Sequence, residues 1–181
     1  MIKGSCFSLR HVKKSEVQQF VELINHPEAK GDFLSLEMML QGVIEKRMED
    51  ESHSKENCET FLIIDENGAM IGRVFHFKTI PYFNSREIGF GMFSKEFRSK
   101  GIMSEAVQLL SAYLFKTLLI NRLAIHMHID NVASEKVAIN CGFRKEGVAL
   151  GASFSRGKHV DIAMYALLRE EWESLPKSIK S

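Results

Sequence analysis

The stretch FRSKGIMSEA, residues 97–106, places a basic turn that contains a glycine directly before a strongly helical segment. Gly101 permits backbone conformations that other residues resist. The first turn of a helix presents backbone N–H groups without partners and the positive end of the helix dipole, and both attract an anion. Arg98 and Lys100 add positive charge, and Ser104 can donate a hydrogen bond from its hydroxyl group. These residues indicate a cradle for phosphate or pyrophosphate.

Alternatively, these residues form an ordinary loop before a surface helix. A single turn with one glycine is a weak signal for an anion site. The chain contains neither the GxxxxGK[ST] pattern of P-loops nor the GxGxxG pattern of dinucleotide-binding folds. The strand before the turn, however, carries Gly89 and Gly91 two positions apart, on one strand face. Glycines inside a strand often mark a bulge or a place where a ligand lies against the backbone.

Two segments resemble those of a known family. FRSKGIM, residues 97–103, is similar to the acetyl-coenzyme A signature of the GNAT N-acetyltransferases, and NVASEKVAINCGF, residues 131–143, is similar to the segment that follows it. Over nearly its full length the chain resembles the branch typified by the ribosomal-protein N-terminal acetyltransferases RimJ and RimL. The resemblance implies direct attack of an amine on acetyl-CoA in a ternary complex, without a metal.

The resemblance also implies which residues bind acetyl-CoA. Backbone amides of the turn and of the first helical residues would hold the pyrophosphate. Strand backbone before the turn would pair with the pantetheine arm and point an N–H at the thioester carbonyl, a donor typically worth about 3 kcal/mol. The predicted cofactor-binding residues are Gly91, Met92, Phe93, Arg98, Ser99, Lys100, Gly101, Ile102, Met103, Ser104, Asn131 and Ser134.

The predicted catalytic residues are Ser134 and Glu87. Many relatives carry a tyrosine that protonates the leaving thiolate where this chain has Ala138, so Ser134 is the candidate to contact the sulfur and relay a proton. Alternatively, its hydroxyl is solvated or caps the helix. Glu87 is the candidate base, acting through water; alternatively, it faces solvent at a strand edge or pairs with an arginine. Asn131 either contacts the pantetheine or only caps the helix that follows.

Other side chains have weaker signals. His126 and His128 lie on one strand face, and such a pair can hold a metal. No third ligand with suitable spacing is nearby, so a polar strand face beside a ligand or under a helix is the preferred interpretation. The aromatic residues around the loop before the glycine strand either wall the acceptor site or pack in the core; they are Phe75, Phe77, Tyr82 and Phe83.

The acceptor is predicted to be the α-amine of a protein or peptide N-terminus. A small amine, such as a polyamine, an amino sugar or an amino acid, is the alternative within the same chemistry. A non-catalytic acyl-CoA-binding module is the alternative from another class, because the tyrosine is missing at Ala138.

Hydrophobic periodicity and turn residues predict the elements that position these groups. Strands are expected at 5–12, at 60–80 as a hairpin that turns at Asn67-Gly68, at 86–93, at 121–130, and twice within 142–168. Helices are expected at 14–24, at 35–50 with Ser35 as cap, from the turn to about 117, and at 131–141. This order predicts a mixed α/β (α+β) fold in one domain, residues 1–181, with about seven strands and about four helices. The polar tail is expected to fray from about residue 174.

Composition limits the class of protein. The chain has 181 residues, of which 45% are hydrophobic and 26% are charged, and its formal net charge is +1. Such a balance gives no strong field that would attract nucleic acid or an anionic membrane. The N-terminus lacks an apolar signal core, and no run approaches the length of a membrane span. A cytoplasmic protein is expected, as a monomer or a homodimer.

Overall fold

A computed structural model describes residues 1–49, 58–80, 82–176 and 179 of the chain. In these residues one sheet contains eight strands in the order β1-β2-β3-β4-β5-β6-β8-β7. The strands are β1 (Ile2–Lys3), β2 (Phe7–His11), β3 (Cys58–Asp65), β4 (Met70–Phe77), β5 (Ser85–Met92), β6 (Arg122–His128), β7 (Arg144–Ser155) and β8 (Lys158–Leu168). All neighbouring pairs are antiparallel except β5 and β6, which are parallel.

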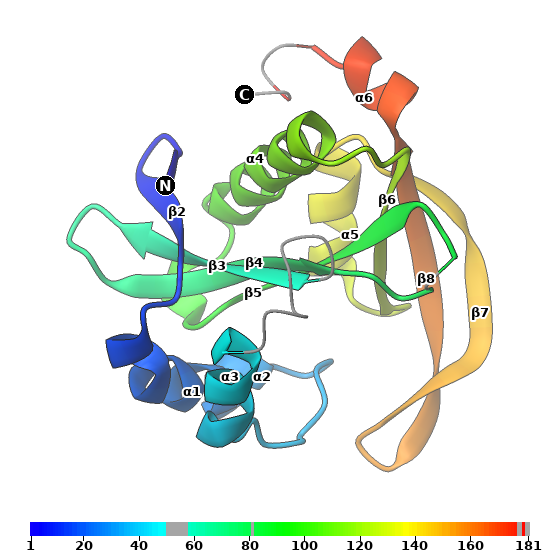
Figure 1. Cartoon of the computed structure of the whole chain (residues 1–181). Helices are drawn as coiled ribbons and strands as arrows, with labels where there is room; N and C mark the ends of the chain where they lie inside the picture. Colours follow the sequence, from blue (N-terminus) through cyan, green and yellow to red (C-terminus); the bar gives the residue numbers. More distant parts are fainter. Residues whose placement is uncertain (50–57, 81, 177–178, 180–181) are drawn as a thin grey trace.

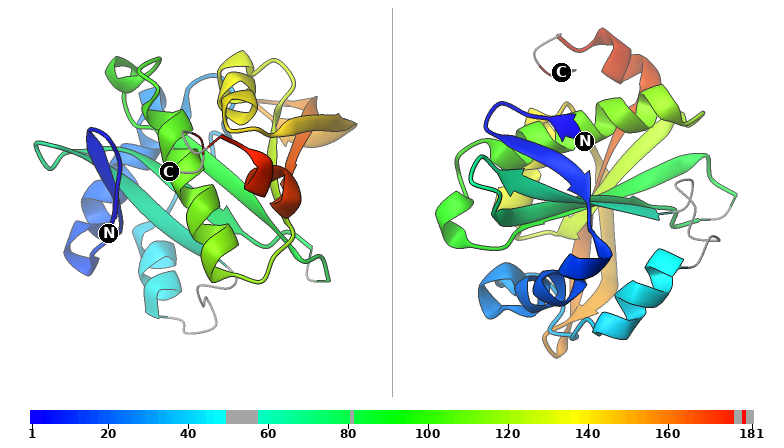
Figure 2. Two further views of the ribbon diagram at one scale, coloured as in Figure 1. Left: turned by 90° about the horizontal axis from the view of Figure 1, so that it is seen from above. Right: turned by 60° about the vertical axis from the view of Figure 1, so that its left-hand side comes forward.

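Helices cover both faces of this sheet (Figure 1). The helices of the described residues are α1 (Val17–Asn25), α2 (Pro27–Lys30), α3 (Gln41–Glu49), α4 (Ile102–Thr117), α5 (Val132–Asn140) and α6 (Arg169–Ser174), with 3-10 turns η1 (Lys14–Glu16) and η2 (Lys95–Phe97). The turned views show α1, α2 and α3 on one face and α4 on the other (Figure 2).

The predicted mixed α/β fold is confirmed. The eighth strand, β1, is only two residues long and pairs Ile2 with Leu9. Such a short segment has no periodicity from which it could be predicted. Among the described residues, six α-helices replace the expected four or so, and two of them, α2 and α6, are very short. The first of these begins with Pro27 at its N-terminus, a position that suits proline.

The helix predicted at 35–50 is wrong in its first part, because α3 begins only at Gln41. Both backbone groups of Met39 are bonded to the side chain of Asn25, whose Nδ2 donates to Met39 O and whose Oδ1 accepts from Met39 N, each at 2.8 Å. Ser35 accepts from the N–H of Glu37 instead of capping a helix. These side-chain bonds hold the segment before α3 in a non-helical conformation. The end of the prediction, residue 50, lies outside the described residues.

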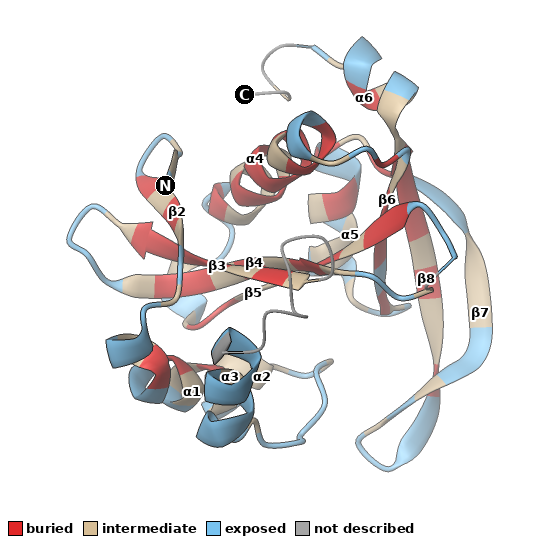
Figure 3. Cartoon of the chain, in the orientation of Figure 1, coloured by how far each residue is buried: buried red, intermediate tan, exposed pale blue. Residues whose placement is uncertain are grey.

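The sheet packs against α4 to form the main core (Figure 3). The side of α4 that faces the sheet is fully buried at Ala106, Val107, Leu110 and Leu114. A second, smaller cluster lies between α1 and the other face, around Phe20 and Ile24. Burial of these helix faces fixes α4, and with it the turn that precedes α4, against the sheet.

The tail begins with the short helix α6, and its contacts are not wholly polar. Trp172 of α6 is 8% exposed, and its ring centroid lies 5.2 Å from that of Phe115 in α4. The expected fraying beyond this helix stays a prediction, since residues 177–178 and 180–181 lie outside the described part.

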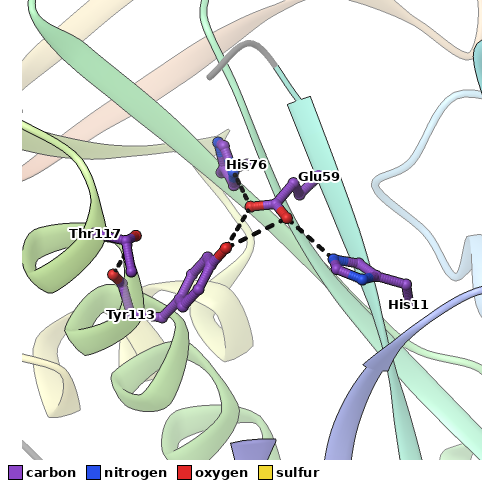
Figure 4. A network of polar contacts seen from close by, with 5 residues as sticks. All are labelled: His11, Glu59, His76, Tyr113 and Thr117. Carbon is purple, nitrogen blue, oxygen red and sulfur yellow. Dashed lines mark hydrogen bonds and ion pairs between the residues drawn. The ribbon is translucent and has the colours of Figure 1, made fainter. Parts of the chain in front are cut away.

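A buried carboxylate, Glu59 of β3, joins β2, β4 and α4 (Figure 4). Its side chain lies 3.0 Å from His11 Nε2 and 3.3 Å from His76 Nε2, and it accepts a hydrogen bond of 3.1 Å from the Tyr113 hydroxyl. Burial raises the pKa of this carboxyl, but these polar partners outweigh burial and lower the pKa from 4.5 to about 2. A carboxyl with a lowered pKa stabilises the fold above its unfolded-state pKa, and this stabilisation is lost as the pH falls from about 4.5 towards 2.

We therefore expect Glu59→Gln to lower the free energy of unfolding at pH 7 by about 3 kcal/mol, at ~1.4 kcal/mol for each pKa unit. The measurement is urea unfolding of both proteins between pH 7 and pH 2.5. The difference between wild type and variant should shrink below pH 4.5, because the wild type then loses the same contribution. A difference that stays constant over this range would contradict the prediction.

Candidate active site

β5 and β6 pair only at their beginnings. Ser85, Arg86 and Glu87 face Arg122, Leu123 and Ala124, and the pairing ends there. Beyond this point β5 continues to Met92 beside β4 and β6 continues to His128 beside β8, so the two parallel strands diverge (Figure 1). Alternate N–H and C=O groups along the inner edge of β5 then lack a strand partner. An extended ligand can pair with this edge.

Glycine occupies positions 89 and 91 of β5 for two different physical reasons. A Cβ atom on Gly89 would lie 2.2 Å from the ring of Phe75, so packing of this ring requires a glycine. A Cβ atom on Gly91 would meet nothing within 4 Å. Gly91 therefore leaves open space beside the diverging edge. Of the neighbouring residues predicted for the cofactor, Met92 and Phe93 bury their side chains, and the N–H of Phe93 already donates to Ile71 O.

The turn after β5 leads into α4 with an uncapped N-terminus. Gly101 has φ +80°, and the side chain of no described residue caps the helix there. A Cβ atom on Gly101 would meet nothing within 4 Å. Ser99 also has a positive φ, +60°, a conformation that costs about 1–3 kcal/mol in a residue other than glycine. The start of α4 thus lacks a side-chain cap, and a side chain at position 101 would meet open space; both features suit an anion site.

The basic side chains of the turn have partners within the protein. Arg98 Nη2 donates to the carbonyl of Glu28 in α2 at 2.7 Å, and the N–H of Arg98 donates to Lys95 O. Lys100 Nζ lies 5.6 Å from the centroid of the Phe97 ring. Arg98 therefore ties the turn to α2, and its amide is not available to a ligand. Ile102 is buried, so it can offer only backbone to the turn.

α5 packs beside the first turn of α4. The Cys141 thiol, which follows α5, donates to Ser104 O at 3.2 Å. Asn131 caps α5, because its Oδ1 accepts from the N–H of Ser134 at 3.1 Å. The hydroxyl of Ser134 has no hydrogen-bond partner among the described residues, whereas Ala138 is fully buried. The end of α5 thus packs against the first turn of α4, while Asn131 and Ser134 lie at the beginning of α5.

Glu87 lies where the paired part of β5 and β6 ends. Its Oε2 is 2.9 Å from Nδ1 of His126, which lies two residues beyond Ala124 on β6. The side chains are 14% and 32% exposed. Glu87 thus pairs with an imidazole, where one alternative from the sequence was an arginine. The sequence showed His126 only as part of an H-x-H pattern, and the contact with Glu87 depends on which strands are neighbours.

These two side chains lie on the sheet face that α1, α2 and α3 partly cover. On the same face of β4, opposite Glu87 and Gly89, lie Phe77 and Phe75, whose rings stack at 5.9 Å. Further along β6, the His128 ring lies 5.1 Å from that of Phe33. A pocket of about 140 Å³ adjoins His128, between the loop of Phe33 and the tip of the β7–β8 hairpin at Arg156. This pocket lies on the sheet face opposite α4.

A buried tyrosine lies beside α5. The Tyr165 hydroxyl donates to Glu135 in the first turn of α5, and burial raises the pKa of Tyr165 to about 12. No sequence pattern predicts this contact, because the two residues are 30 positions apart along the chain. Tyr165 is 2% exposed and holds β8 against α5.

In the part of the chain that is described, no group of three or more His, Cys, Asp or Glu side chains is arranged to hold a metal ion. Over the same residues, no helix combines the length and the apolar character needed to cross a membrane.

The family model described as "Acetyltransferase (GNAT) domain" matches residues 7–144, which is more than half of the chain. Among curated proteins, the chain is 40% identical over 87 residues to "Putative ribosomal N-acetyltransferase YdaF" of Bacillus subtilis (strain 168), covering 48% of this chain and 47% of that protein. The chain thus spans about half the length of this relative.

Solved structures have the same fold. RimL, described as a ribosomal L7/L12 alpha-N-protein acetyltransferase in complex with coenzyme A, superposes with a TM-score of 0.79 at 25% identity, covering 91% of this chain and 95% of that chain. Spermidine N-acetyltransferase from Vibrio cholerae, in complex with CoA and spermine, has a TM-score of 0.79 at 18% identity, with 94% and 100% of the two chains covered. At the lower identity the likeness shows the fold alone.

Proposed function

Because the chain belongs to the GNAT family of acetyltransferases, we propose that it transfers an acetyl group from acetyl-CoA to the α-amine of a protein or peptide N-terminus. The observation that carries this proposal is the divergence of β5 and β6 beside the uncapped start of α4. The names of the B. subtilis relative and of RimL, both of which refer to ribosomal substrates, support the choice of acceptor.

The residues fit acetyl-CoA by their free space and free donors. The N–H groups at Gly101, Ile102 and Met103 would hold the pyrophosphate, since a Cβ atom at position 101 would point into open space. The edge of β5 at Gly91 would pair with the pantetheine arm. When bound, acetyl-CoA supplies an activated acetyl group as a thioester.

In the transfer, the amine nitrogen bonds to the thioester carbonyl carbon and the carbon–sulfur bond breaks. The amine must lose a proton and the thiolate must gain one. Glu87 with His126 would accept the amine proton, directly or through water, because they lie at the root of the divergence. The Ser134 hydroxyl, which is free of partners among the described residues, would donate to the sulfur. The net products are the acetylated amine and the CoA thiol.

An α-amine suits this site better than a lysine. At pH 7 about 14% of an α-amine of pKa near 7.8 is neutral, against roughly 0.04% of a lysine of pKa near 10.4. Deprotonation therefore costs the lysine about 3.5 kcal/mol more. A site whose base is one partly exposed carboxylate–imidazole pair meets the smaller cost more easily.

The experiment is acetylation of a peptide that carries one free α-amine and one lysine, with the label mapped by mass spectrometry. We expect the label on the α-amine. Label mainly on the lysine would overturn the α-amine assignment. Rapid turnover of spermidine with no labelled peptide would show that the acceptor is a polyamine. Binding of acetyl-CoA without turnover of any amine would show that the protein is a non-catalytic binding module.

Substitutions of Asn131 test whether this residue only caps α5 or also binds acetyl-CoA. Asn131→Ala should lower the free energy of unfolding by about 1 kcal/mol, because the cap of α5 is lost. If the amide also contacts the pantetheine, acetyl-CoA affinity should fall by about 5- to 10-fold, the worth of one neutral hydrogen bond. Thermal melting and calorimetric titration measure the two effects.

Asn131→Ser is the matched control, since serine caps a helix as well as asparagine does. It should restore stability but not acetyl-CoA affinity. Wild-type affinity in the serine variant would mean that Asn131 only caps α5.

A further inference from the structure

Arg73 lies on the sheet face that carries Glu87. Its Cα pairs with that of Gly91, as those of Phe75 and Phe77 pair with Gly89 and Glu87. Because side chains two residues apart share a strand face, Arg73 and the two aromatic rings form one row on β4. The neighbouring row on β5 has no side chains until Glu87 is reached. Arg73 thus projects beside the open backbone of the diverging strand.

The guanidinium of Arg73 lies beside two aromatic rings. Its Cζ lies 4.9 Å from the centroid of Phe75 and 5.9 Å from that of Phe20 in α1. Among the described residues, no carboxylate pairs with it and no acceptor takes a hydrogen bond from it. Burial lowers the pKa of Arg73 to about 10. A partly buried guanidinium presents planar donors that match a carboxylate, and it is costly to bury without an anion.

A second cation lies close by. The pKa of Lys30 in α2 is lowered, first by burial and then by the positive charge of Arg73, while the Glu37 carboxylate acts in the opposite direction. Lys30 Nζ donates to the backbone carbonyl of Glu37 at 2.5 Å. Two partly buried cations that repel each other leave a local excess of positive charge, which favours an anionic ligand.

The spacing between these cations and Glu87 indicates the size of that ligand. Gly91 and Glu87 are four residues apart on β5, or roughly 13 Å at about 3.3 Å per residue. The guanidinium of Arg73 lies over the ring of Phe75, and Phe75 pairs with Gly89. The distance from the guanidinium to Glu87 is therefore shorter than the distance from Gly91 to Glu87. A free amino acid is too short to place its amine at Glu87 and its carboxylate at Arg73. An extended peptide reaches with the carboxylate of its second or third residue.

We propose that Arg73, with Lys30, binds a carboxylate of the acceptor, so that the preferred substrate is a polypeptide with Asp or Glu at its second or third position. This inference rests on the proposed function, because it places the α-amine at Glu87 and His126. The same cations would repel a polyamine.

The test compares two peptides that differ only in Ser-Asp-Glu against Ser-Asn-Gln at the N-terminus, with wild-type enzyme and saturating acetyl-CoA. We expect kcat/KM to be about 10- to 100-fold higher for the acidic peptide, the worth of one hydrogen-bonded charge. Arg73→Met, which keeps an apolar side chain between Phe20 and Phe75, should remove this preference, so that the ratio of kcat/KM for the two peptides falls to about 1. Lys30→Met should reduce the preference by a smaller factor.

The outcomes distinguish the inference from the function on which it rests. Equal kcat/KM for both peptides in the wild type overturns the carboxylate site but leaves the α-amine acetyltransferase standing. Turnover of neither peptide overturns the proposed acceptor itself. A phosphate of the cofactor is the other anion that Arg73 could meet, so acetyl-CoA affinity is measured for Arg73→Met; a loss there assigns Arg73 to the cofactor and overturns the inference. If Arg73→Met does not fold, the wild-type peptide pair and Lys30→Met decide the question.

Discussion

Replacing Gly101 by valine is expected to abolish measurable acetyl-CoA binding at concentrations that saturate the wild type. A branched side chain at this position would project into the open space before α4, where the pyrophosphate would approach the backbone. Hydrogen bonds to charged groups contribute about 1.5–3 kcal/mol each, so the loss of two weakens binding by roughly 100-fold or more. Isothermal titration with acetyl-CoA measures the change.

The control must reproduce the backbone strain, since Gly101 has φ +80° and valine resists this region. Gly68, in the turn between β3 and β4, has φ +84° and also has no atom within 4 Å of a built Cβ. Gly68→Val should lose similar stability and keep acetyl-CoA affinity. If Gly101→Val binds acetyl-CoA as the wild type does, the cradle is assigned to the wrong turn.

Glu87→Gln is expected to lower kcat by about 100-fold or more while acetyl-CoA affinity stays unchanged, since general base catalysis typically contributes 10²–10⁴-fold. The amide is nearly isosteric but cannot accept the amine proton or form an ion pair with the imidazole of His126. In the variant, the amine must lose its proton to solvent. The residual rate should therefore rise with pH as the α-amine titrates near 7.8. Steady-state kinetics from pH 6 to pH 9 give both quantities.

Glu16→Gln is the matched control, because Glu16 also pairs with a basic side chain, Arg10, and is 18% exposed against 14% for Glu87. It lies in η1, away from the diverging strands. It should leave kcat unchanged. His126→Gln should lower kcat less than Glu87→Gln if the imidazole only positions the carboxylate, and as much if the proton passes through it. A Glu87→Gln enzyme with wild-type kcat would remove this pair from the reaction.

The sequence alone determined the features that are local along the chain. The turn at Gly101, the helix after it and the cap at Asn131 depend on backbone freedom, propensity and capping over a few residues, so their types and spacing predicted them. The order of elements, together with the family motifs, predicted the mixed α/β fold. Periodicity failed where side chains from elsewhere decide the backbone, as at Met39, which is bonded to Asn25 across fourteen positions.

Only the tertiary structure decided which side chains meet. Pairing of β5 with β6 stops at Glu87, and this brings Glu87 to His126, although neither position signals the other in sequence. The register of β4 on β5 places Arg73 beside Gly91, and packing of α1 supplies Phe20 to its guanidinium. The same fold also brings Arg98 to α2, a contact for which the sequence carried no signal. These contacts join residues far apart along the chain, and they arise because strand neighbours and helix packing are set by burial of the whole core.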